Sequence, residues 1–275
     1  MTVSTLIFAY WGAKLVAALV ALVFGCAKFV DWRRQKKGAV NPPTASLHGD
    51  QQYATRPAPM MSSERHESVA RYNHIADDLH TGDVFLFSGR ALHSYLIRIP
   101  TWSRMSHCGM IYRDHGGKVL VAEVVERFKL HRNGWRFSID KGGFNLTPLL
   151  GYVLANPGQC YVGKVAEEYD RPDKFNRTAA REAIDASKHW AYGYLGIAFQ
   201  ILTKLPFLRE IAYFWTWKNI DTAWDKKFPP FCSWADSIWA TIAGQDPTPC
   251  LAPQLTTPAE IERSKLWGTK VALVP

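Results

Sequence analysis

Residues 106–130 read SHCGMIYRDHGGKVLVAEVVERFKL, and this stretch decides the centre of the fold. Two apolar runs, residues 106–113 and 119–130, are rich in β-formers and are separated by HGGK at 115–118. The pattern predicts a β-hairpin, because adjacent glycines permit the backbone angles of a tight turn. The two strands are therefore expected to lie side by side in an antiparallel sheet.

One polar pair is notable on this hairpin. Side chains alternate along a strand, so His107 shares a face with Gly109 and Ile111. On the second strand Glu123 lies in a row of valines, where a carboxylate is costly unless it is paired. A histidine on the neighbouring strand is a suitable partner. Taken singly, His107 can instead be a core histidine with satisfied hydrogen bonds, and Glu123 a solvent-exposed edge residue.

A cysteine follows two prolines in PPFCSWADSIWA, residues 229–240. Pro230 favours an extended entry, so Cys232 is expected in the first turn of a helix over residues 232–244. Unpaired N–H groups and the positive end of the helix dipole favour a thiolate there, which lowers the pKa of the thiol. A reactive cysteine is one interpretation of Cys232, and a buried packing cysteine is the other.

The other elements indicate an α+β fold. Strands are also predicted at GDVFLFSG (82–89) and QCYVGKVA (159–166), and helices over residues 62–79 and 174–191. Strands therefore cluster between about residues 82 and 166, and helices dominate afterwards. This segregation favours an antiparallel sheet packed against helices over alternating βαβ units.

Five motifs, in chain order, resemble the circularly permuted branch of the NlpC-type papain-like thiol hydrolases: TGDVFLFSG, SHCGMIY, VLVAEVVE, AYGYLG and FCSWADSIW. That branch includes the YiiX-like bacterial proteins and the lecithin:retinol acyltransferase-like proteins. The resemblance covers about residues 80–265 and implies a permuted papain-like fold. It also implies that Cys232 is the nucleophile, His107 the general base and Glu123 the residue that orients the imidazole. Cys108 departs from the pattern, since valine is common at that position.

The resemblance further implies a reaction and its substrate contacts. The expected reaction cleaves an amide or an ester through a thioester on Cys232, by hydrolysis or by acyl transfer. Tyr192, Tyr194, Ser106 and Trp234 are expected to contact the substrate, and no cofactor is implied. The alternative is a catalytically inactive lipid-binding or scaffold module of the same fold.

Composition argues against two other classes of protein. Residues 1–40 hold six Lys and Arg side chains and one acid, so they carry five of the nine net positive charges. The remaining charge is scattered rather than clustered on one face, so no nucleic-acid partner is expected. The five cysteines are odd in number and lack CxxC spacing. This disfavours a disulfide framework and a zinc site, and no metal is expected.

An apolar segment, LIFAYWGAKLVAALVALVFGCAKFV at residues 6–30, is long enough to span a membrane if Lys14 reaches the interface. We expect residues 1–32 to form a single-pass anchor, which makes the membrane a partner. A lipoprotein signal that lipidates Cys26 and a buried core helix are the alternatives. The basic WRRQKK that follows favours a cytoplasmic catalytic domain, whereas a lipoprotein would place the domain in the periplasm.

The rest of the chain divides into a tether and a domain. Residues 33–64 are polar and contain several prolines, which is typical of a tether. Residues 65–275 are expected to form the thiol hydrolase domain, with an aromatic-rich helical insertion at about 195–228. The anchor and the aromatic content together favour an acyl-lipid substrate, and cell-wall peptides stay open.

Overall fold

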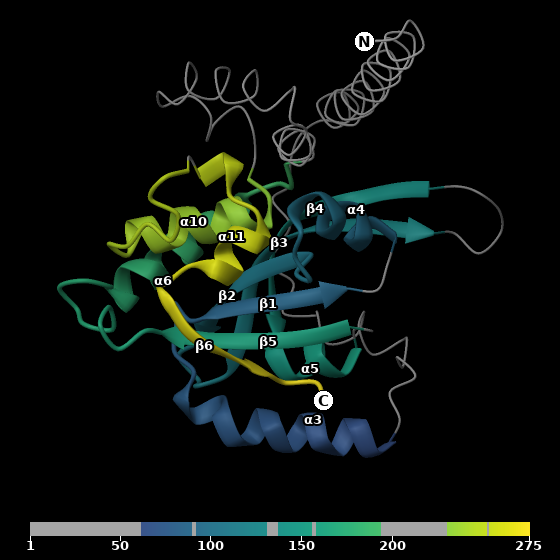
Figure 1. The fold of residues 1–275 in the computed structure, drawn as a ribbon, viewed down its shortest axis with the longest axis horizontal. Helices are drawn as coiled ribbons and strands as arrows, with labels where there is room; N and C mark the ends of the chain where they lie inside the picture. Colours follow the sequence, from purple (N-terminus) through teal and green to yellow (C-terminus); the bar gives the residue numbers. More distant parts are fainter. Residues whose placement is uncertain (1–61, 90–91, 131–136, 156–157, 194–229, 252) are drawn as a thin grey trace, which may run out of the picture.

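An antiparallel sheet forms the centre of the protein (Figure 1). The structure is a computed structural model, and it describes residues 62–89, 92–130, 137–155, 158–193, 230–251 and 253–275. Within these residues the sheet has six strands: β1 (Val84–Gly89), β2 (His107–Arg113), β3 (Val119–Leu130), β4 (Phe137–Pro148), β5 (Gly158–Val165) and β6 (Trp267–Ala272). Their order is β4-β3-β2-β1-β5-β6, and all neighbours are antiparallel.

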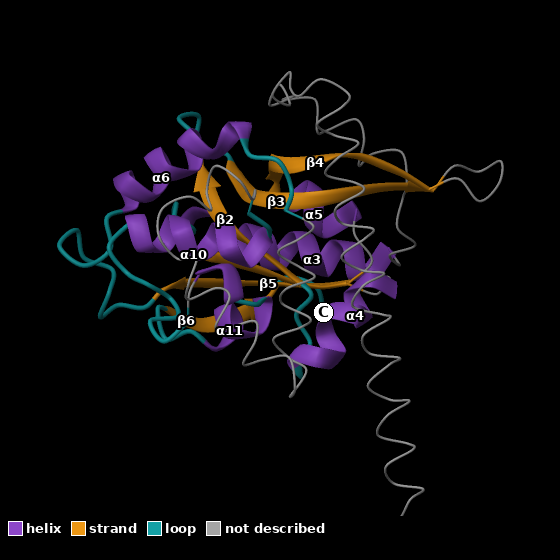
Figure 2. Cartoon of the chain, turned by 90° about the horizontal axis from the view of Figure 1, so that it is seen from above, coloured by secondary structure: helices purple, strands orange, loops and turns teal. Residues whose placement is uncertain are grey.

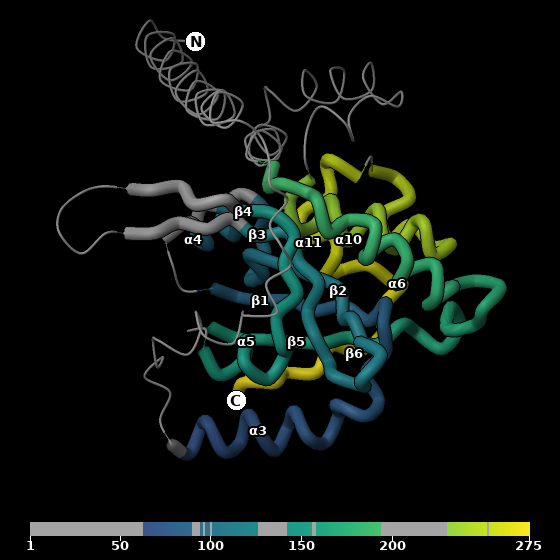
Figure 3. Tube along the Cα trace, turned by 180° about the vertical axis from the view of Figure 1, so that it is seen from behind, coloured from purple at the N-terminus to yellow at the C-terminus, as the bar shows by residue number. Residues whose placement is uncertain are grey.

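Helices cover both faces of this sheet. The described ones are α3 (Ser62–Ile75), α4 (Leu92–Thr101), α5 (Leu149–Ala155), α6 (Arg177–Ala186), α10 (Cys232–Ile242) and α11 (Pro258–Arg263), with short 3₁₀ turns at Ala76–Asp78, Ser187–His189 and Pro253–Leu255. Figures 1 and 3 show α10 and α11 on one side of the sheet and α3 on the other. The α+β class predicted from the sequence is confirmed.

Alternating side chains on the central strands supply two separate cores. Val84, Leu86 and Cys108 face α10 and α6 in the first core. Phe85 and Ile111 point to the opposite face and pack with α5 and the end of α3 in the second. Because both faces are covered, the first four residues of β1, Val84 to Phe87, are all apolar. Figure 2 shows α10 crossing above the strands of the first core.

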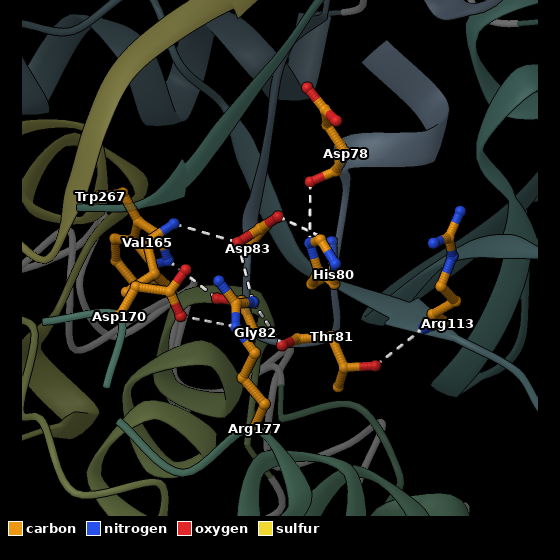
Figure 4. Close-up of polar contacts among 10 residues, drawn as sticks. All are labelled: Asp78, His80, Thr81, Gly82, Asp83, Arg113, Val165, Asp170, Arg177 and Trp267. Carbon is orange, nitrogen blue, oxygen red and sulfur yellow. Dashed lines mark hydrogen bonds and ion pairs between the residues drawn. The ribbon is translucent and has the colours of Figure 1, made fainter. Parts of the chain in front are cut away.

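The Gly-Asp pair at the start of β1 has a structural role (Figure 4). Asp83 is fully buried, and its carboxylate accepts hydrogen bonds from the backbone N–H groups of His80 (2.8 Å) and Val165 (3.0 Å). The same carboxylate pairs with Arg177 at 3.0 Å, and this guanidinium also binds Asp170 at 2.8 Å. A buried charge is tolerated when it is paired and hydrogen-bonded in this way. The network joins the start of β1 to the end of β5 and the start of α6.

Several predicted segments lie outside the described residues. These are the anchor (1–32), the insertion (195–228) and most of the tether (33–64), so their assignments stay predictions. Helix α3 begins at Ser62, two residues before the predicted end of the tether. In the part of the chain that the structure describes, none of the helices combines the length and the apolarity that crossing a membrane requires.

Candidate active site

Cys232 is the first residue of α10 and is 5% exposed. The preceding residue, Phe231, is extended with φ −111° and ψ 178°, and no side chain caps the helix. The Ala235 N–H donates to the Phe231 carbonyl at 2.9 Å, so Cys232 lies within the uncapped first turn. The helix therefore begins where the sequence predicted, and the sulfur lies at the positive end of the helix dipole.

His107 begins β2, and its ring contacts the carboxylate predicted to orient it. The distance from His107 Nε2 to Glu123 Oε2 is 2.7 Å. The Glu123 side chain is fully buried, while that of His107 is 17% exposed. Since β4 continues the sheet beyond β3, Glu123 is not at an edge, and the alternative of a solvent-exposed glutamate is wrong. Because Nε2 faces the carboxylate, Nδ1 is the ring nitrogen left for another partner.

Two polar side chains of β4 support the Glu123 carboxylate, one directly and one through the other. The Thr147 hydroxyl donates to Glu123 Oε1 at 3.0 Å, and the Asn145 amide donates to the Thr147 hydroxyl at 2.7 Å. Thr147 is 1% exposed. Neither residue is indicated as part of the site by the sequence pattern alone. In the sequence FNLTP (144–148), Asn145 and Thr147 are two positions apart and so share a face of the strand. This spacing points to Glu123 only once β4 is known to pair with β3.

Gly109 makes room for the carboxylate to reach the histidine. A Cβ atom at this position would lie 2.7 Å from the Ala122 carbonyl oxygen and 2.9 Å from Val121 Cγ1. It would also lie 3.3 Å from Glu123 Cβ. Each distance is shorter than ordinary van der Waals contact. The glycine between His107 and Ile111 is thus required by the close approach of β3, as its place beside the histidine suggested.

Cys232 and His107 are electrostatically coupled. Hydrogen bonding from Cys108 lowers the pKa of the Cys232 thiol well below its usual value, and the charge of His107 and a hydrogen bond to its ring add to this against the effect of burial. Burial alone would lower the pKa of His107. The charge of Cys232 and hydrogen bonds to Cys232 and Glu123 instead raise it well above the usual value. These directions favour a thiolate–imidazolium pair.

Two further titratable groups lie behind the sulfur. Cys108 is fully buried, and burial raises the pKa of its thiol well above the usual value. Asp236 lies one turn after Cys232 on α10 and is 1% exposed. Among the described residues, neither of its carboxyl oxygens has a hydrogen-bond partner of ordinary geometry. Burial raises the pKa of Asp236 well above its usual range, and the neighbouring Cys108 thiol works against this without cancelling it. This direction makes Asp236 a weaker candidate for a base than His107.

The four residues expected to contact substrate have different environments. Ser106 is buried, accepts from the Gly89 N–H at 3.0 Å and donates to the Phe87 carbonyl at 3.3 Å. Ser106 directly precedes His107, so these two hydrogen bonds hold the start of β2 against the end of β1. Tyr192 and Trp234 are buried in the same core as Cys232, and Tyr194 lies outside the described residues. Substrate contact by these four stays a prediction.

Together the contacts bring Cys232, His107 and Glu123 close to one another, with the Glu123 carboxylate buried and the uncapped first turn of α10 at Cys232. Within the described residues, no group of three or more His, Cys, Asp or Glu side chains is placed to hold a metal ion.

Comparisons with known proteins give a structural likeness only. No family model and no curated protein matches this sequence. Five chains of solved structures match. One of them is the metalloprotein yiiX from Escherichia coli O157:H7, with 15% sequence identity and a TM-score of 0.45. The match covers 70% of this chain and 96% of that chain.

Proposed function

We propose that this protein is a thiol hydrolase or acyltransferase that cleaves an amide or an ester through a thioester intermediate. The observation that carries the proposal is Cys232 at the start of α10, coupled to His107, whose Nε2 lies 2.7 Å from Glu123. This is the arrangement of a nucleophile, a base and an orienting group. The buried Thr147 hydroxyl supports the orienting carboxylate at 3.0 Å.

The reaction follows from these positions. The Cys232 thiolate attacks the substrate carbonyl carbon, and the Cys232 N–H in the first turn of α10 donates to the oxygen that becomes negative. The His107 imidazolium then gives its proton to the departing amine or alcohol as the carbon–nitrogen or carbon–oxygen bond breaks. The acyl group is left on sulfur. Neutral His107 next removes a proton from water or from an acceptor, which attacks the thioester and releases Cys232.

Acyl substrates test this function directly. The full-length chain in detergent micelles is incubated with p-nitrophenyl esters of increasing acyl length, and intact mass spectrometry detects the acyl group on the protein. The expected result is an acyl adduct on Cys232 and release of p-nitrophenol. Cys232→Ala is expected to lower that release by at least about a thousandfold. Full activity in Cys232→Ala would refute the proposal.

Two controls separate chemistry from folding and define the substrate. Cys250→Ser changes an exposed cysteine and is expected to leave activity unchanged. His107→Ala is expected to abolish acylation while Cys232 stays present. A parallel incubation with a muropeptide mixture tests the cell-wall alternative. Preference for long acyl esters would favour a lipid substrate, whereas release of muropeptide fragments would favour a peptide substrate.

A further inference from the structure

Exposed apolar side chains gather on α4 and the turn that follows it. Tyr95 is 44% exposed, Ile99 70% and Trp102 89%. Of the five large hydrophobic residues that are exposed in the described part of the chain, these three lie within eight positions. Tyr95 and Ile99 are four residues apart and share one side of α4, and Trp102 is the first residue after the helix. We refer to Tyr95, Ile99 and Trp102 as the α4 surface.

The backbone holds Trp102 away from the core. Its φ is +50°, and it is the one non-glycine residue with positive φ among the described residues. The Trp102 N–H donates to the Ile99 carbonyl and the Ser103 N–H to the Arg98 carbonyl, both at 3.3 Å. This is a helix C-terminal motif in which the left-handed position usually carries glycine. A bulky aromatic residue there costs conformational energy, which the surrounding structure has to offset.

The surroundings of this surface are basic. The Arg98 guanidinium lies 5.2 Å from the centre of the Tyr95 ring. Arg263 is exposed and donates to the Trp102 carbonyl at 3.2 Å. The Arg104 side chain is 58% exposed and pairs at 3.2 Å with Glu262. Arg98 and Arg263 thus contact residues of the α4 surface, and Arg104 is paired with Glu262, so the net charge beside this surface is positive and complements a negatively charged surface.

The α4 surface lies at the same end of the sheet as His107. Helix α4 directly follows β1, and the chain returns from Trp102 to His107 within five residues. The Ser106 N–H donates to the Phe87 carbonyl at 2.9 Å, which fixes this return against β1. The Ser103 hydroxyl donates to Glu262 on α11 at 2.9 Å. These hydrogen bonds fix the segment that follows the α4 surface against β1 and α11, and this segment leads directly into His107.

We propose that the α4 surface contacts an anionic lipid bilayer. Tryptophan, tyrosine and isoleucine suit the boundary between headgroups and acyl chains, and flanking arginines suit acidic headgroups. This contact holds the His107 end of the sheet at the bilayer, where acyl chains are available. It is a second membrane contact, separate from the expected anchor at residues 1–32, and it does not depend on catalysis.

Local lipid labelling tests the contact in the full-length chain. Because the expected anchor would bind vesicles in any case, the readout must be site-specific. Vesicles of equal parts phosphatidylglycerol and phosphatidylcholine carry a phosphatidylglycerol with a photoreactive diazirine, and cross-links are mapped by peptide mass spectrometry. Label on residues 92–104 is expected to exceed that on the peptides of exposed Ile242 and Val271 about tenfold.

Matched variants make the result decisive. The double substitution Ile99→Glu with Trp102→Glu is expected to reduce the label to the level of the comparison peptides, whereas Ile242→Glu leaves it unchanged. Vesicles of phosphatidylcholine alone are expected to give several-fold less label. Equal label on all three peptides, or full label in the double variant, would overturn the proposal. Cross-links between copies of the chain at this surface would also overturn it. Cys232→Ala is expected to keep the label, so a failure of the proposed catalytic function can be distinguished from a failure of the proposed membrane contact.

Discussion

Replacing Glu123 by glutamine keeps the shape of the side chain and removes its charge. The carboxylate is fully buried and lies 2.7 Å from His107 Nε2. A hydrogen bond to a charged group contributes about 1.5–3 kcal/mol, which corresponds to about 1–2 pKa units. Glu123→Gln should therefore lower the pKa of His107 by about this amount. Because Cys232 and His107 titrate as a pair, the thiolate loses support and the pKa of Cys232 should rise.

Alkylation with iodoacetamide measures this change, because the thiolate is the reacting form. Rates are followed between about pH 4 and pH 9, and peptide mass spectrometry separates Cys232 from the exposed Cys250. An ordinary thiol with a pKa of about 8.5 is only about 0.3% ionised at pH 6. The rate for Cys232 should instead reach its plateau well below pH 8.5, and Glu123→Gln should move that midpoint upward.

The matched control is Glu67→Gln, which removes a carboxylate from the exposed surface of α3. This variant should leave the Cys232 midpoint unchanged, and circular dichroism should show that both variants are folded. Two results contradict the reasoning: an unmodified protein whose Cys232 titrates near pH 8.5, or a Glu123→Gln protein with the original midpoint. Either would show that an imidazolium held by Glu123 does not support the thiolate.

Three further predictions test the fold and the buried groups. Asp83→Ala removes one of the two carboxylates that pair with Arg177 and the acceptor of two backbone N–H groups, and should lower the free energy of unfolding in urea by about 3–5 kcal/mol; a loss below about 1 kcal/mol would contradict this. Gly109→Ala forces β2 and β3 apart and should cost about 1–3 kcal/mol while raising the alkylation midpoint of Cys232, and an unchanged midpoint would count against the packing argument. The raised pKa of Asp236 keeps it protonated when folded, whereas an unfolded carboxyl ionises near about pH 4. Stability should therefore fall as pH rises from about 4 toward the native pKa, and urea unfolding at several pH values should show that Asp236→Asn removes this decline.

Local patterns predicted the central hairpin and the start of α10. Alternation fixed which residues of β2 and β3 share a face, so the pairing of His107 with Glu123 followed from the strands alone. Pro230 indicated that the helix begins at Cys232. Both signals act within a few residues of the chain. The approach of Cys232 to His107, across about 125 positions, was supplied by the family resemblance rather than by any local pattern.

Elements whose pattern depends on distant partners were not predicted. Strand β6 and helix α4 have short, mixed sequences, and β6 becomes a strand by pairing with β5. Helix α6 was expected over residues 174–191 but begins after Asn176, whose side chain accepts from the N–H groups of Thr178 and Ala179. The helical spacing of α10 placed Ile242 on its apolar side, yet this residue is 55% exposed because it lies at the helix end.

The two buried carboxylates, Asp83 just before β1 and Glu123 on β3, serve different purposes. Asp83 precedes β1, while His107 pairs with Phe87 near the end of that strand. Four residues of strand separate the two sites by about 14 Å. Sites this far apart with no shared partner contribute almost independently to stability. Asp83→Ala should thus lower the free energy of unfolding without moving the alkylation midpoint of Cys232. Glu123→Gln should move that midpoint. Any loss of unfolding free energy that Glu123→Gln causes should add to the loss caused by Asp83→Ala. A double variant whose loss departs from the sum by more than about 0.5 kcal/mol would show that the structural network and the candidate site are one coupled unit.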